Sequence, residues 1–195
     1  MSAEEAVLTF EDAAQWEYWL AEHHDGGTGV WLKIAKKGSG ATSVTQPQAL
    51  ATCLCYGWID SHRRSFDEKF YLQRYSRRRT GSPWSQVNVE QAEALIAEGR
   101  MRPPGLAEIA SAQVDGRWSA AYPSQRNATA PPDLVAALEE HPRAKAAYDC
   151  LGKTGQYAVI LRLAKTRTPQ GRATCLATVI AGLEAQPAAG GRSKS

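Results

Sequence analysis

The chain has 195 residues, of which 43% are hydrophobic and 22% charged, and its formal net charge is +3. These values indicate a soluble globular protein that can bury a core, and so small a net charge says little about partners. No apolar run approaches the length of a membrane span, and the acidic start MSAEEAVLTF lacks the apolar core of a signal peptide, so we expect a cytoplasmic protein.

The first half of the chain mixes helical and strand patterns. The pair Thr9–Asp12 fits a capping box and predicts a helix that runs to about His23. Alternating apolar residues over 29–37 then predict a half-buried strand. A second capping box, Thr45 with Gln48, predicts another helix.

A β-hairpin is expected next. Gly57 is placed to end the preceding helix, and residues 58–66 and 69–75 show the period of two that is typical of strands. Every later pattern is helical. The predicted helices lie near residues 89–96, 106–110, 134–138, 144–151, 157–164 and 168–183.

Strands and helices are therefore segregated along the chain. This favours an α+β fold with a small antiparallel sheet of about three strands, and it disfavours a parallel doubly wound sheet. Residues 1–122 are expected to form an α+β core with a basic hairpin and an arginine loop. Residues 123–184 form a helical part expected to pack on the same core, and residues 185–195 a disordered polar tail.

The most basic stretch is 62–79, with seven basic and two acidic residues. It leads into a helix start whose free amides favour an anion, and arginine grips carboxylate or phosphate through two hydrogen bonds. We therefore predict a basic pocket for a small anionic or aromatic molecule. Its predicted residues are Arg74, Arg77, Arg78, Arg79, Ser82, Trp84, Ser85, Asn88, Trp58 and Arg100. In the alternative reading, Trp84 packs in the core and the arginines are solvated or paired with acids.

Candidate catalytic groups are few. Asp60 could orient an arginine or act as a general base, and Cys55 could be a nucleophile if arginines favoured its thiolate. For both, a structural role is the competing interpretation. The four cysteines lack a CxxC spacing and the four histidines show no ligand spacing, so we expect free thiols, no metal and no cofactor.

Several motifs resemble the YdeI/OmpD-associated family, also called the bacteriocin-protection family. They are CYGWID (55–60), the arginine loop with its Ser-x-Trp-Ser-x-x-Asn end (74–88), GRM (99–101), AQVDGRW (112–118) and TPQGRATCL (168–176). The resemblance implies a small bacterial protein linked to tolerance of bacteriocins and cationic antimicrobial peptides. It supplies no catalytic residues. Where the family usually has a proline before its arginines, this chain has Ser76.

Three hypotheses follow from these residues. The first is a stress or antimicrobial-tolerance protein that binds a small anionic or aromatic ligand in the basic pocket. The second is a cofactor-independent enzyme that uses the same pocket with Asp60 or Cys55. The third is a nucleic-acid binder with Trp31, Tyr71, Tyr75 and Trp84 as stacking faces, against which the near-neutral charge counts. Nothing in the sequence indicates the oligomeric state.

Overall fold

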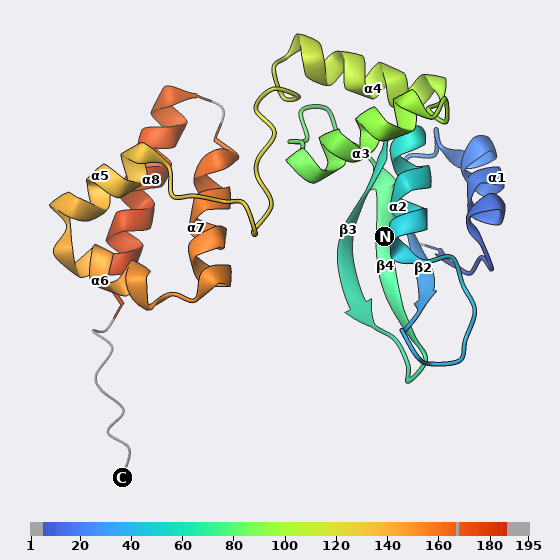
Figure 1. Ribbon diagram of the computed structural model, residues 1–195, viewed down its shortest axis with the longest axis horizontal. Coiled ribbons are helices and arrows are strands. Elements are labelled where there is room, and N and C mark those ends of the chain that lie inside the picture. The colour runs from blue at the N-terminus through green and yellow to red at the C-terminus, as the bar shows by residue number, and fades with distance from the viewer. Residues whose placement is uncertain (1–5, 167, 187–195) are drawn as a thin grey trace. The chain divides into compact units, whose positions relative to one another are not determined.

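The computed structural model describes residues 6–166 and 168–186 of the chain. It divides into two compact units, one up to Ala121 and one from Tyr122 (Figure 1). The first unit holds a sheet and four helices, and the second holds helices, so the predicted α+β class is confirmed. Most of the predicted tail (185–195) lies outside the described residues. The packing of residues 123–184 on the first core stays a prediction.

The sheet has four strands in the order β1-β2-β4-β3. They are β1 (Val7–Leu8), β2 (Val30–Ala35), β3 (Trp58–Ser65) and β4 (Phe70–Arg77). The three predicted strands pair antiparallel, with β4 in the middle. The prediction missed β1, which pairs parallel with β2. A strand of two residues carries no period of its own, so only its partner reveals it.

Local signals set the ends of the helices in the first unit. These are α1 (Ala13–His23), α2 (Gln46–Cys55), α3 (Gln86–Ala97) and α4 (Pro103–Val114). Asp12 rather than Thr9 caps α1, because its carboxylate accepts a hydrogen bond from the Gln15 N–H at 2.9 Å. The Thr45 N–H donates to Gln48 Oε1 at 3.1 Å, as predicted. Gly57 has φ +72°, the left-handed conformation that ends α2 and turns the chain into β3.

One face of the sheet carries the core of the first unit, and Figure 1 shows α2 in front of the sheet, running along the strands. Val30, Leu32 and Ile34 point to this face and are buried. Trp16 of α1 reaches the same core, with its ring centroid 6.0 Å from that of Tyr75 and 6.4 Å from that of Trp58. Helices α1 and α2 therefore cover one face of the sheet, and aromatic rings fill the space between them and the strands.

The second unit consists of four helices among its described residues. They are α5 (Pro132–Glu140), α6 (Pro142–Cys150), α7 (Lys153–Ala164) and α8 (Pro169–Glu184). Helix α8 packs against the other three, around a core that includes Leu134, Leu163 and Leu183. The guanidinium of Arg172 on α8 holds Asp133 of α5 through two hydrogen bonds of 2.6 and 2.9 Å. In the described part of the chain, no helix is both long and apolar enough to cross a membrane.

Candidate functional site

The arginines of the predicted pocket lie on different faces. Arg74 is paired with Trp31 across β2 and β4, so both point away from the core, and its Nη1 lies 3.2 Å from Ser76 Oγ. Arg77, three residues later, is paired with Trp58 and points to the core face at the end of β4. Because successive residues of a strand alternate, two arginines three apart cannot share a face. Arg78 is buried, and Arg79 is exposed in the loop that follows.

Trp84 is a core residue, with 2% of its surface exposed. The Arg78 guanidinium stacks 3.7 Å from the centroid of its ring, and Trp118 contacts it edge-on at 4.8 Å. Arg78 also donates to the Pro83 carbonyl at 3.2 Å. Because Arg78 and Trp118 pack against the ring and almost none of its surface is exposed, Trp84 offers no open face to a ligand. The fully buried Trp58 donates from Nε1 to the His24 carbonyl at 2.8 Å and is likewise part of the core.

The remaining predicted residues have local roles. Ser85 caps α3, since its hydroxyl accepts from the Asn88 N–H at 3.2 Å. Arg100 is paired with its neighbour Glu98 at 3.3 Å on the surface. The Ser82 carbonyl accepts a hydrogen bond from a residue that the sequence prediction did not include, Arg117.

Arg117 is the centre of a buried polar network. Its side chain is 8% exposed and lies 2.8 Å from Glu108 Oε1 and 2.7 Å from Asp115 Oδ2. It also donates to the Ser82 carbonyl at 3.0 Å and to Ser111 Oγ at 3.2 Å. The network ties the arginine loop to the middle and the C-terminal end of α4. The signal in the sequence was the Asp-Gly-Arg-Trp turn, where an arginine stands between an aspartate and a tryptophan that packs against the core.

A small cavity of about 180 Å³ opens where Arg77 meets the start of α4. Its lining residues are Tyr56, Gly57, Arg77, Pro104, Ala107 and Glu108. Within residues 6–166 and 168–186, the Arg77 side chain forms no ion pair and no hydrogen bond. Glu108 is the carboxylate of the lining and is paired with Arg117, which Asp115 shares. Within the described part of the chain, Arg77 is therefore the charged group of the lining that has no ion pair.

The two catalytic candidates occupy partly or fully buried positions. Cys55 is 2% exposed, and burial raises the pKa of its thiol, so the thiolate needed for nucleophilic attack is disfavoured. Burial also raises the pKa of Asp60, which accepts a hydrogen bond from Gln46 Nε2 at 3.5 Å. Across the described residues, no group of three or more His, Cys, Asp or Glu side chains could hold a metal ion.

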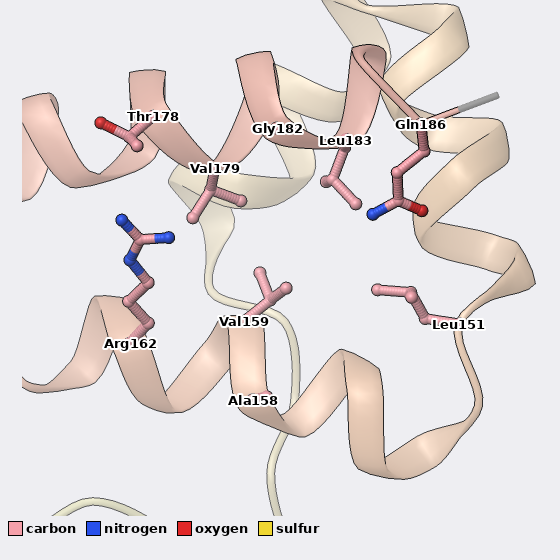
Figure 2. Close-up of a pocket in the computed structure, with 9 residues that line it drawn as sticks. All are labelled: Leu151, Ala158, Val159, Arg162, Thr178, Val179, Gly182, Leu183 and Gln186. Atoms are coloured by element: carbon pink, nitrogen blue, oxygen red, sulfur yellow. The ribbon is translucent and has the colours of Figure 1, made fainter.

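The second unit has a groove of about 300 Å³ between α7 and α8. Figure 2 shows Arg162 of α7 extending toward Thr178 and Val179 of α8 at one end, with Leu151 and Gln186 at the other. The floor between them is mostly aliphatic. The sequence prediction named none of these residues, because they came from helical patterns that were read as core.

Two family models match the chain, one within each unit. Residues 8–108, more than half of the chain, match the family described as a domain of unknown function, DUF8412. The chain belongs to the DUF8412 family. Residues 127–186 match the family described as "Bacteriocin-protection, YdeI or OmpD-Associated", which confirms the predicted resemblance. No curated protein and no solved structure matched the chain.

The DUF8412 match contains strands β2, β3 and β4, the arginines of the predicted pocket and the cavity lined by Arg77. Of the motifs that suggested the bacteriocin-protection family, CYGWID, the arginine loop and GRM fall within it. The AQVDGRW motif lies between the two matches, and TPQGRATCL lies in the second. The description that names a function therefore attaches to α5–α8, and the cationic groups belong to the DUF8412 domain.

Proposed function

We propose that this protein acts in bacteriocin protection or a related stress response as a binding protein for a small anionic or aromatic molecule. The role in protection rests on the family description that matches residues 127–186. The binding site proposed for the ligand is the cavity between Arg77 and the start of α4. This site replaces the broad basic pocket expected from the sequence, since the arginines around it are dispersed.

One observation carries the proposal: Arg77 lines a cavity whose carboxylate, Glu108, is already paired with Arg117 at 2.8 Å. A guanidinium without a native partner is a ready donor to a carboxylate or phosphate group. Tyr56 also lines the cavity, which places an aromatic side chain beside the proposed ligand. At about 180 Å³ the cavity is smaller than a drug-sized site, so it suits a small anion or the anionic end of a larger molecule.

A cytoplasmic location belongs to the same proposal. The four cysteines are free thiols, and free thiols are typical of reducing compartments. The enzymatic alternative lacks comparable support. Its two candidate groups, Cys55 and Asp60, have raised pKa values through burial, and neither lines the cavity.

A thermal-shift screen at low salt would test the proposal with inorganic phosphate, acetate, benzoate and phosphorylated metabolites. A ligand of the site raises the melting temperature of the natural protein, because it binds only the folded state. Arg77→Ala is expected to weaken binding about 10- to 100-fold, since one hydrogen bond to a charged group contributes about 1.5–3 kcal/mol.

Arg79→Ala is the matched control, because Arg79 is an exposed arginine two residues away that does not line the cavity. Equal ligand stabilisation in the two variants would refute the site. Production of the natural chain and of Arg77→Ala in a bacteriocin-sensitive strain separates the site from the role. If both proteins protect the strain, the role in tolerance is supported and the cavity at Arg77 is not needed for it.

A further inference from the structure

The sheet face opposite α1 and α2 carries alternating cationic and apolar side chains. We call it the outer sheet face. Register and strand alternation place on it Trp31, Lys33, Arg64, Phe70, Leu72 and Arg74. Arg64 is exposed and Trp31 half-buried, and Phe66, beyond the end of β3, is 50% exposed. A sheet face with this composition is not built as core.

Cationic side chains lie over aromatic rings on this face. The Arg64 guanidinium lies 4.3 Å from the centroid of the Trp31 ring, and Lys33 Nζ lies 4.4 Å from that of Phe70 and 4.8 Å from that of Phe66. Arg64 projects from β3 and Trp31 from β2, so the arginine crosses the central strand β4. Its stem and that of Lys33 flank Leu72, which is only 1% exposed although it points outward.

The charge around the outer sheet face is strongly unbalanced. The sheet and its hairpin carry Lys33, Lys36, Lys37, Arg63, Arg64, Lys69, Arg74 and Arg77 against Asp60, Asp67 and Glu68. Asp67 lies at the hairpin turn, 3.9 Å from Lys33 Nζ, and its side chain also accepts from the Lys69 N–H. Asp60 points to the core face, so Asp67 and Glu68 at the turn leave a net positive charge that suits an extended polyanion.

We propose that the outer sheet face binds single-stranded nucleic acid. A single strand presents both a regular row of phosphates and unpaired aromatic bases, and basic sheets with outward aromatic rings bind both parts. A base that stacks on Trp31 takes the place of the Arg64 guanidinium, which then reaches a phosphate. In duplex nucleic acid the bases are paired and stacked on one another, so they cannot stack on the aromatic rings of this face. The inference is independent of the cavity at Arg77.

Fluorescence anisotropy with labelled dT15 and U15 would test it, using the full chain at 50 and 200 mM salt. Three phosphate contacts predict a loss of affinity of roughly 20-fold between these salt concentrations. Trp31→Ala is expected to weaken binding about 10-fold or more through lost stacking. The double variant Arg64→Ala/Arg74→Ala should lower the salt slope by about 1.4. Phe66→Ala removes an exposed ring and keeps the test valid if Trp31→Ala fails to fold.

The control variant Arg126→Ala/Lys145→Ala removes the same charge from exposed positions in the second unit and should bind like the natural protein. Tighter binding of single strands than of a 15-base-pair duplex, with losses in both the aromatic and the arginine variants, would support the inference. No binding at 50 mM salt would overturn it. Equal competition by polyphosphate would overturn it too, and so would normal binding by the aromatic variants. Either result would mean that the surface binds negative charge without contacting the bases.

Discussion

Replacing Arg117 with glutamine should destabilise the first unit strongly. The change removes the cation that Glu108 and Asp115 share, together with hydrogen bonds to Ser82 and Ser111. Loss of one partner from a buried ion pair costs about 3–5 kcal/mol. The Glu108 side chain is 18% exposed and that of Asp115 44%, so solvent screens part of the loss. We therefore expect about 3 kcal/mol, the lower end of that range.

Tryptophan fluorescence reads this effect without interference from the second unit. All six tryptophans lie between Trp16 and Trp118, within the unit that ends at Ala121. A loss of about 3 kcal/mol corresponds to a fall in melting temperature of about 10 °C for a unit of this size. Arg117→Lys should recover little of it, because an ammonium cannot reproduce the planar fork that holds two carboxylates.

The same variant also tests the charge assignment of the cavity. Without Arg117, the carboxylate of Glu108 is left beside Arg77, so anion binding should weaken even below the melting temperature. The control is again Arg79→Ala, with an expected change within about 0.5 kcal/mol for an exposed charge. A fall of less than about 3 °C in Arg117→Gln would refute the claim that the buried network stabilises the first unit.

Three further results are expected. Gly57→Ala should lower the free energy of unfolding by about 1–2 kcal/mol, because φ is +72° and the new Cβ would lie 3.1 Å from the Pro104 carbonyl oxygen. A fluorescence melt that matches the natural protein would contradict this. A native thiol titration at pH 8 should show two fast thiols out of four, since Cys53 and Cys55 are buried and burial raises both pKa values; four fast thiols would contradict that burial. The Arg172 guanidinium lowers the pKa of Asp133, so its stabilisation is present above the unfolded pKa of about 4 and is lost as pH falls through the folded pKa. Asp133→Asn should therefore flatten the acid dependence of helix melting followed by circular dichroism, by less than about 1 kcal/mol because both side chains are over a third exposed.

Signals within a few residues predicted much of the fold. The capping box at Thr45, the glycine at position 57 and the serine cap at Ser85 each act through neighbouring backbone groups, so their effect is visible in the sequence. Strand β1 lacked such a signal, because its two residues are defined by pairing with β2. The predicted cap of α1 was Thr9 and the observed cap is Asp12, since both side chains carry an oxygen that can accept a hydrogen bond from the start of a helix.

The candidate site was harder to predict, since it depends on contacts between distant residues. Trp84 is enclosed by Arg78 and by Trp118, which is distant in the sequence, so no local pattern reveals this contact. The separation of Arg74 from Arg77 was within reach of the sequence, because strand alternation places residues three apart on opposite faces. The pairing of Glu108 with Arg117 joins two residues from different segments, so it can be known only from the fold.

A crystal structure of the protein with the strongest ligand from the thermal-shift screen would test the proposed site most directly. The cavity lined by Arg77 predicts ligand density beside Gly57 and Pro104, with an anionic group within hydrogen-bonding distance of the Arg77 guanidinium. Density in the α7–α8 groove at Arg162, with the Arg77 cavity left to solvent, would contradict it.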